Sequence, residues 1–420
     1  MNKSKIIICG AGIAGVACAY YLSKQQSEKN GNVEILLIDK LHPLSLTTSM
    51  SGENFREYWP QHCLHEFSSH SINLMEKLQH EHPNEFAMKY YGYDFISRNK
   101  GEHIFQTDYD QNNSGFTLID DEEKIKSQYP YLDSSIKQIV KLHRAGGFDV
   151  YALGSLMLKL ARKNGVQFIQ GEITDIKKNK ENYQVSLGND IYETQKLVLS
   201  GGPFTKMLAQ FLDIKLPIYS ISQRKFVIPD PANLIPRDMP FTIYADKQKL
   251  NWSDDELEMI SSDEKYNYLL DEFPAGLHIK PEGQNQIKIG WAFNRKPESP
   301  KWDLADDPEF PDVVLRGATR FIPSLEQYLD VIPTPVVQFS GYYTRTKENL
   351  PLIGNLDENL FVVTALAGYG TMTACAAGEL CTSYINQLDL PDYARYFAPA
   401  RYDDEALMQE IKSVNSDGQL

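Results

Sequence analysis

A glycine-rich turn near the start of the chain constrains the fold more than any other feature. Gly10, Gly12 and Gly15 follow a short β-branched apolar run at residues 6–9, which indicates a strand buried on both faces. Residues 16–24 then place apolar and aromatic side chains three and four positions apart, which predicts a helix. Gly10 permits the tight turn, Gly12 lets the backbone approach a ligand, and Gly15 lets the helix pack closely on the strand. The glycines therefore predict a strand–turn–helix unit that holds a ligand at the turn.

A second buried strand, residues 33–38, completes the unit and ends on Asp39. Asp39 lies 24 residues after Gly15, where a carboxylate accepts hydrogen bonds from the hydroxyls of an adenosine ribose. The helix N-terminus offers N–H groups and a positive dipole end to the phosphates. A carboxylate here repels a 2′-phosphate, so FAD or NAD is favoured over NADP. We expect this unit to contact the cofactor through Gly10, Ala11, Gly12, Ile13, Ala14, Gly15, Asp39 and Lys40.

A second glycine turn lies near the C-terminus, between an expected strand at residues 360–366 and an expected helix at residues 371–388. The N-terminus of that helix would stabilise negative charge that develops during reaction, such as that at N1–C2=O of a reduced flavin. An ordinary strand–helix turn without a ligand is the alternative. Beyond the first unit, the expected cofactor contacts are Ile173, Gly201, Gly202, Gly341, Gly368, Tyr369, Gly370, Thr371 and Met372.

The remaining patterns predict an α/β protein in which a Rossmann-like domain is interleaved with an antiparallel-rich α+β domain. Residues 151–164 are typical of an amphipathic helix, whereas residues 225–228 and 276–279 belong to a series of strands separated by Pro-rich turns. The last dozen residues are polar and are expected to form a loose tail. The predicted cofactor domain comprises residues 1–85, 147–217 and 340–400, the substrate domain residues 86–146 and 218–339, and the C-terminal tail residues 401–420.

Composition limits the partners of the chain. Its 42 basic and 56 acidic side chains give a net charge of −14, which argues against nucleic acid or an anionic membrane as a partner. No segment reaches the roughly 18 apolar residues needed to span a bilayer. The five cysteines have no CxxC spacing, which is typical of reduced thiols in a cytoplasmic protein. The paired histidines lack further ligands in suitable positions, so we expect no metal.

Three segments carry a resemblance to a known family. They are the N-terminal βαβ unit, the sequence Gly147-Phe148-Asp149 before a helix, and residues 341–354 (GYYTRTKENLPLIG). Together they resemble the D-amino acid oxidase family, the FAD-dependent group that includes glycine oxidase and sarcosine oxidase. The resemblance covers nearly the whole chain in the right order, residues 251–273 excepted. It implies FAD in an extended conformation and hydride transfer from a substrate C–H to flavin N5, which gives an imine when the substrate is an amine.

The resemblance also implies roles for individual side chains. Lys288 matches the sarcosine-oxidase lysine that lies over the flavin and assists reaction with O2, unless it is a surface lysine. Arg56 matches a family arginine beside the flavin and the substrate, where a guanidinium binds a carboxylate, unless it forms an ion pair on a helix. Together with Tyr343, these two are the candidate catalytic residues.

The chain departs from the family at three positions. Gly341 stands where sarcosine oxidase has the cysteine that tethers its flavin, so we expect non-covalent FAD. Met372 replaces a lysine that binds the substrate carboxylate, and Tyr343 replaces the corresponding arginine of glycine oxidase. These departures indicate a more aromatic pocket, in which the expected substrate contacts are Arg56, Trp291, Tyr342, Tyr343 and Tyr369.

The sequence therefore predicts an FAD-dependent oxidoreductase that oxidises a small amine or amino acid and passes electrons from its flavin to O2, giving H2O2. An FAD-dependent hydroxy-acid dehydrogenase that uses a quinone or protein acceptor remains an alternative, as does a non-catalytic flavoprotein subunit. Residues 251–273 hold eight acids and one base, so they carry a charge of −7, which is half of the net charge. We interpret them as a solvated helix or loop, with a lid that selects cationic amines as the alternative.

Overall fold

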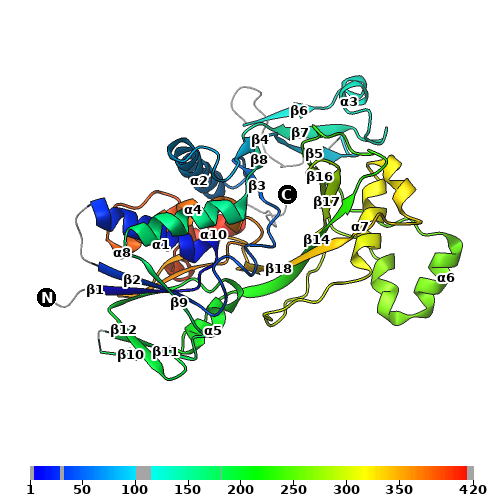
Figure 1. Ribbon diagram of the computed structural model, residues 1–420. Helices are drawn as coiled ribbons and strands as arrows, with labels where there is room; N and C mark the ends of the chain where they lie inside the picture. The colour runs from blue at the N-terminus through cyan, green and yellow to red at the C-terminus, as the bar shows by residue number, and fades with distance from the viewer. Residues whose placement is uncertain (1–3, 29–32, 101–114, 181, 414–420) are drawn as a thin grey trace.

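Two large β-sheets lie side by side in the computed structural model, and both pack against helices (Figure 1). The structure describes residues 4–28, 33–100, 115–180 and 182–413. The first sheet has six strands in the order β19-β20-β13-β1-β2-β9, all parallel except for the edge pair β19–β20. The strands are β1 (Ser4–Cys9), β2 (Val33–Asp39), β9 (Gln167–Gln170), β13 (Lys196–Leu199), β19 (Leu352–Asp357) and β20 (Leu360–Thr364).

The first sheet is buried on both faces, as the apolar run in β1 predicts. Ile6 and Ile8 pack against helices on one face. Ile7 and Cys9 pack on the other face against a small antiparallel sheet and α5 (Thr205–Gln210). The helices are α1 (Ile13–Glu28), α2 (His62–Glu81), α4 (Val150–Lys163) and α8 (Gly370–Ile385); the small sheet is β10 (Asp175–Asn179), β11 (Asn182–Leu187) and β12 (Asp190–Thr194).

The second sheet has eight strands in the order β18-β14-β17-β16-β15-β5-β7-β6, and only the β15–β5 pair is parallel. Its outer face packs on α7 (Phe310–Thr319), where Phe226, Ile289 and Val314 share one core. The strands are β5 (Tyr93–Ser97), β6 (Phe116–Ile119), β7 (Gln138–Leu142), β14 (Tyr219–Pro229), β15 (Phe241–Tyr244), β16 (Leu277–Glu282), β17 (Gln286–Gly290) and β18 (Val337–Arg345). The predicted fold class, a parallel Rossmann-like sheet with an antiparallel-rich second sheet, is confirmed.

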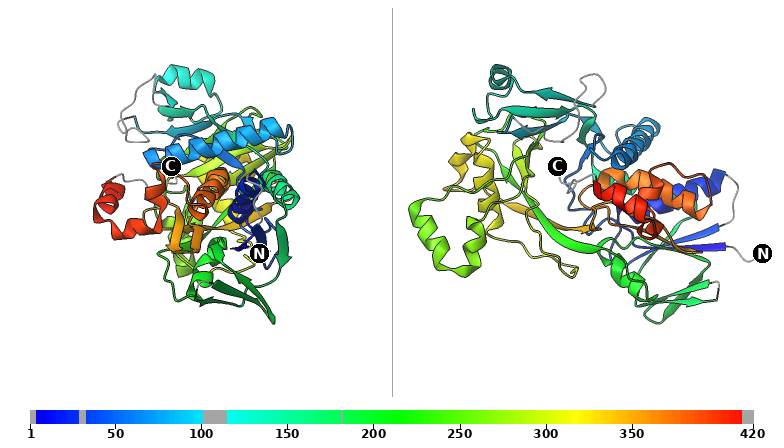
Figure 2. Two further views of the ribbon diagram at one scale, coloured as in Figure 1. Left: turned by 90° about the vertical axis from the view of Figure 1, so that its left-hand side faces the viewer. Right: turned by 180° about the vertical axis from the view of Figure 1, so that it is seen from behind.

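The long strands β14 and β18 of the second sheet pair with each other and extend from it toward the first sheet (Figures 1 and 2). They therefore hold the open face of the second sheet opposite the carboxyl ends of β1 and β13. A three-stranded ribbon of β3 (Asn54–Arg56), β8 (Ala145–Gly147) and β4 (Lys89–Tyr90) lies between the sheets. The remaining helices are α3 (Glu122–Gln128), α6 (Asp254–Ser262), α9 (Ala394–Phe397) and α10 (Glu405–Ser413).

The C-terminal stretch differs from the loose tail that its polar composition suggests. α10 extends to Ser413 and buries Ile411, while residues 414–420 lie outside the described part of the chain. Arg401, only 1% exposed, binds Glu348 at 2.5 Å and so fixes the approach to this helix. A few apolar contacts and one buried ion pair therefore stabilise a helix in a segment whose polar composition predicts a loose tail. The division of the chain into two discontinuous domains remains a prediction.

The acidic residues 251–273 lie at the far end of the second sheet, away from the first (Figure 2). Ser253 and Glu256 form a reciprocal cap at the start of α6, which explains why this acidic sequence begins a helix there. Glu256 binds Arg316 of α7 at 2.7 Å. All of these residues are described and none lines the pocket discussed below, which contradicts the lid hypothesis. Within the described chain, no helix combines the length and apolar character of a membrane span.

Candidate active site

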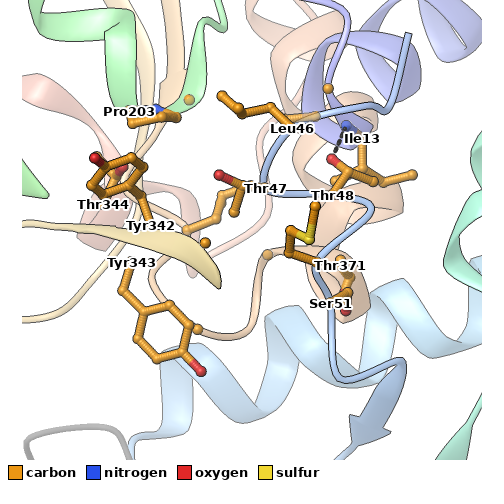
Figure 3. Close-up of a pocket in the computed structure, with 18 of the residues that line it drawn as sticks. Ile13, Leu46, Thr47, Thr48, Ser51, Pro203, Tyr342, Tyr343, Thr344 and Thr371 are labelled. Carbon is orange, nitrogen blue, oxygen red and sulfur yellow. Dashed lines mark hydrogen bonds between the residues drawn. The ribbon is translucent and has the colours of Figure 1, made fainter. Parts of the chain in front are cut away.

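A deep pocket lies where the carboxyl ends of β1, β2 and β13 face the open side of the second sheet. Strand order reverses at this edge, because β1 continues through α1 to β2 on one side and pairs with β13 on the other. Such a switch point opens a crevice at the carboxyl ends of parallel strands. Both glycine turns line it, together with residues 44–48 and 50–53, which cross the pocket between α8 and β18 (Figure 3).

The three glycines of the first turn have different functions. A Cβ on Gly10, whose φ is +111°, would lie 2.4 Å from the carbonyl oxygen of Ser200. A Cβ on Gly15 would lie 1.8 Å from the carbonyl oxygen of Gly10, so close packing requires both glycines. A Cβ on Gly12 would meet nothing nearer than Thr48 Oγ1, at 3.5 Å. Gly12 is therefore the glycine that leaves the backbone accessible to a ligand in the pocket.

Asp39 fixes this turn as well as lining the pocket. Its Oδ2 accepts a hydrogen bond from the backbone N–H of Ala11 at 2.6 Å, and its Oδ1 accepts one from Leu41 at 3.0 Å. Burial raises the pKa of Asp39, and these backbone donors oppose that rise. The carboxylate is therefore held at the end of β2. Lys40 follows it and binds Glu172 at 3.0 Å.

The second glycine turn brings another helix N-terminus to the same pocket. α8 crosses α1 in close contact, because a Cβ on Gly378 would lie 2.5 Å from the backbone of Ala17. At its start, Thr371 Oγ1 lies 3.2 Å from Ser51 Oγ, and in α1 the N–H of Ile13 donates to Thr48 Oγ1 at 3.0 Å (Figure 3). Two positive dipole ends, an open glycine and a fixed carboxylate fit a dinucleotide whose far end carries a ring that gains negative charge.

Arg56 lies at the other end of the pocket, on β3, and is only 3% exposed. Its guanidinium stacks over Trp59 with its carbon 3.8 Å from the ring centre and also faces Phe95 at 5.1 Å. Burial lowers the pKa of Arg56 to about 10. Among the described residues, its Nη1 is buried without a hydrogen-bond partner. A buried cation with an unused donor is suited to bind an anionic group of a ligand.

The tyrosines predicted to contact substrate have different environments. Tyr343 lines the pocket with its ring against Gly368, where a Cβ would lie 2.6 Å from the ring, and burial raises the pKa of Tyr343 (Figure 3). The hydroxyl of Tyr342 accepts a hydrogen bond from the N–H of Lys301 at 2.9 Å. Tyr369, 1% exposed, donates to the carbonyl of Asn349 at 2.6 Å, so packing already uses its hydroxyl.

Lys288 lies on the pocket side of β17 but does not itself line the pocket. Its Nζ binds Glu53 at 3.1 Å and Glu282 at 3.0 Å, and Glu53 is the member of this group that lines the pocket. Glu53 has a φ of +61°, an uncommon conformation for a residue other than glycine. Sequence reasoning missed this carboxylate.

Lys225 is a second functional candidate that sequence reasoning missed. It lines the pocket on β14, directly opposite Gly290 of β17. Burial and the positive charges of Lys288 and Lys280 lower the pKa of Lys225 to about 7. The sequence signal was a lysine directly before Phe226, a core residue, on an alternating strand.

Trp291 occupies the core behind the sheet instead of the pocket. Its indole N–H donates to the carbonyl of Pro274 at 2.9 Å, and its ring packs on Phe273 and Phe293. Side chains alternate along a strand, so Trp291 continues the core-facing positions Ile287 and Ile289. Ala11 and Gly15 also lie outside the lining. The other predicted residues that the pocket brings together are Gly10, Gly12, Ile13, Ala14, Asp39, Lys40, Arg56, Ile173, Gly201, Gly202, Gly341, Tyr342, Tyr343, Gly368, Tyr369, Gly370, Thr371 and Met372.

The fold and this pocket are of the kind that binds a dinucleotide. The chain matches the FAD dependent oxidoreductase family over residues 5–384 and belongs to it. The resemblance inferred from sequence is thereby confirmed, and FAD is the cofactor of the family. A Bos taurus protein, FAD-dependent oxidoreductase domain-containing protein 1, is 22% identical over 201 residues, which span 45% of this chain and 41% of that protein.

Two solved structures show the same fold. L-proline dehydrogenase from P.horikoshii has a TM-score of 0.74 and 21% identity, with 96% of this chain and 98% of that chain covered. Glycine oxidase from Bacillus cereus ATCC 14579 has a TM-score of 0.69 and 15% identity, with 93% and 99% covered. At these identities the comparisons establish the fold and leave the substrate and the electron acceptor to be determined from the pocket.

Proposed function

We propose that this protein oxidises a small amino acid at the carbon next to its amine, with non-covalent FAD as the hydride acceptor. The observation that carries the proposal is Arg56, a buried guanidinium with an unused donor at the end of the pocket remote from Asp39. A carboxylate is the ligand whose charge and shape match a guanidinium. The two structural neighbours named above act, by their titles, on proline and glycine, which are both amino acids.

The residues around the pocket would hold FAD in an extended form. Asp39 would bind the adenosine ribose, Gly12 and the start of α1 the pyrophosphate, and the start of α8 the flavin ring. Bound FAD supplies a hydride acceptor at flavin N5 and passes two electrons to a second substrate. Non-covalent attachment is supported by Gly341, which has no side chain to tether the ring.

Arg56 would orient the substrate by fixing its carboxylate, and the aromatic walls would exclude water from the reacting carbon. Phe241 and Ile243 line this part of the second sheet. His278 lines it too, and the distance of 3.0 Å from its Nδ1 to the carbonyl of Gly276 leaves Nε2 as the acceptor when the ring is neutral. Burial lowers the pKa of His278 to about 4, so the ring stays neutral and accepts an N–H from the substrate.

We assign the cation beside the flavin to Lys225 and a positioning role to Lys288, which holds Glu53. A lysine that can be protonated next to the ring stabilises negative charge on O2 as it is reduced, which favours O2 as the acceptor and H2O2 as the product. Replacing Lys225 by Met should slow reoxidation by O2 far more than anaerobic reduction by substrate. Equal slowing of the two half-reactions would disprove the assignment.

The test of the proposed function compares amino acids with the matching amines that lack a carboxylate, for example proline with pyrrolidine. The visible spectrum of the purified protein is recorded before and after anaerobic addition of each compound. We expect flavin bleaching by an amino acid and at least hundredfold weaker binding of its matching amine, a difference that Arg56→Met abolishes. A protein that amines bleach equally well, or that no amino acid bleaches, would refute the proposal.

The electron acceptor is tested on the same samples in air. An oxidase makes H2O2 in step with substrate consumption, whereas a dehydrogenase reduces only a dye or a quinone. The dehydrogenase alternative is kept because the first structural neighbour named above is titled a dehydrogenase. A cytoplasmic location remains part of the proposal and rests on the reduced cysteines.

A further inference from the structure

Residues 291–309 form an irregular connection between β17 and α7, which we term the strap. Connections of this length without secondary structure are uncommon inside compact domains and are often functional. The strap leaves the second sheet and reaches the first, where Trp302 stacks on Phe204 at 3.9 Å with an angle of 12° between the rings. In Figure 1 it is the olive loop that extends from the side of α7 toward α5.

The strap is fixed on both sides of Trp302. Before it, the N–H of Glu298 donates to the carbonyl of Ser220 at 2.9 Å. After it, Gln338 and Asp307 bind each other twice: the side-chain N–H of Gln338 donates to the carbonyl of Asp307 at 2.8 Å, and the Asp307 N–H donates to Gln338 Oε1 at 3.2 Å. The strap is therefore a held segment that presents one aromatic ring to the opposite sheet.

Trp302 lies at the end of the pocket where the adenosine of FAD would bind. The Nζ of Lys40 is 4.7 Å from the centre of the indole ring, and Lys40 directly follows Asp39. Trp302, Phe204 and Lys40 all line the pocket. This cluster joins residues that follow β2 and β13 in the first sheet to a residue carried by the second, so it bridges the two walls of the groove.

We propose that Trp302 acts as a latch that closes the adenosine end of the groove and sets how long FAD stays bound. The ring would cover the dinucleotide while it remains stacked on Phe204, and FAD could leave only after that contact and the contact with Lys40 break. The proposal rests on the FAD of the family and is independent of the substrate. The contact between Trp302 and Phe204 involves neither the glycine turns nor Arg56.

The experiment measures the rate at which FAD leaves the purified holoprotein. A phosphodiesterase in excess splits released FAD to the more fluorescent FMN, so the rise in flavin fluorescence reports dissociation without any turnover. We expect Trp302→Ala to release FAD about tenfold faster than the unchanged protein, which corresponds to about 1.4 kcal/mol. Trp302→Phe keeps a flat ring and should restore most of the retention.

Two further variants separate the latch from a general loss of stability. Gln338→Ala lies outside the pocket lining and frees one end of the strap, so we expect release two- to threefold faster than normal. Trp252→Ala is the matched control, because Trp252 is also partly buried and also faces a cation, Arg316 at 4.2 Å, but lies away from the pocket. Unchanged release from Trp302→Ala, or equal acceleration in Trp252→Ala, would overturn the proposal.

Discussion

Replacing Arg56 by Met should stabilise the FAD-free protein while it abolishes recognition of a carboxylate. Burial lowers the pKa of Arg56 from its ordinary value to about 10, which corresponds to about 3 kcal/mol of destabilisation of the charged form. Stacking on Trp59 and Phe95 returns about 1 kcal/mol for each ring. The balance leaves the cation unfavourable by about 1 kcal/mol, and Met of similar length would keep most of the packing.

The free energy of unfolding is measured by urea denaturation of the FAD-free protein, so that cofactor affinity does not enter the result. Arg401→Met is the matched control. Arg401 is also buried, but it is paired with Glu348 at 2.5 Å and donates to the carbonyl of Pro351 at 2.6 Å. Removing one partner of a buried pair leaves the other charge unpaired, so this variant should lose about 3–5 kcal/mol.

The two arginines are similarly buried, yet we predict opposite changes in the free energy of unfolding when each is replaced by Met. A gain of about 1 kcal/mol in Arg56→Met, together with a large loss in Arg401→Met, would show that Arg56 is kept at a cost to stability for the sake of a ligand. If Arg56→Met destabilised the protein as much as Arg401→Met, Arg56 would have to be a structural residue already satisfied in the folded chain. The assignment of a carboxylate site to Arg56 would then fail.

Three further outcomes follow from the same geometry. Gly12→Ala should unfold at the same temperature as the unchanged FAD-free protein but bind FAD at least tenfold more weakly, whereas Gly15→Ala should fail to fold stably; fluorescence titration and thermal melts distinguish the two. Lys225→Met should raise the stability most below pH 7, with the gain shrinking toward pH 10, because the unfolded chain binds more protons than the folded protein between these values; denaturation at several pH values checks the trend. Neutralising the acids of residues 254–258 should leave the KM for every amine within twofold, and a selective rise for cationic amines would restore the lid hypothesis.

The sequence was sufficient to predict the cofactor-binding βαβ unit, because all parts of that unit lie close together in the chain. The turn at Gly10, Gly12 and Gly15, the apolar runs on both sides and Asp39 all lie within one βαβ unit, and steric contact requires two of those glycines. Burial of β1 on both faces follows from its continuous apolar run. The pairing of α1 with α8 was not predictable, because it depends on the contact of Gly378 with Ala17 across most of the chain.

The substrate half was harder to predict because its side chains come from strands distant in sequence. Trp291 follows β17, and the sequence alone suggests that it could contact a substrate. It belongs to the core instead, because it lies two positions after Ile289 and faces the same side of the sheet. No sequence pattern marks Glu53, because its place at the site depends on a positive φ and on an ion pair with Lys288, which is distant in the chain. The acidic residues 251–273 include the exposed helix α6, as the solvated helix or loop interpretation expects, and Glu256 binds Arg316 of α7; the alternative, a lid at the pocket, was wrong.

The two lysines show most clearly what a sequence pattern leaves open. Lys225 and Lys288 both alternate with core residues, so both face the pocket side of the second sheet. Register separates them: Lys225 pairs with Gly290, whereas Lys288 pairs with Val227, two positions further along β14. A Cβ at Gly290 would lie 2.9 Å from Lys225 Cβ and 2.5 Å from His278 Nε2, so the missing side chain makes room for both groups at the pocket. The glycine at position 290 therefore leaves room for Lys225 to line the pocket, whereas Lys288 is paired with Glu53 and Glu282.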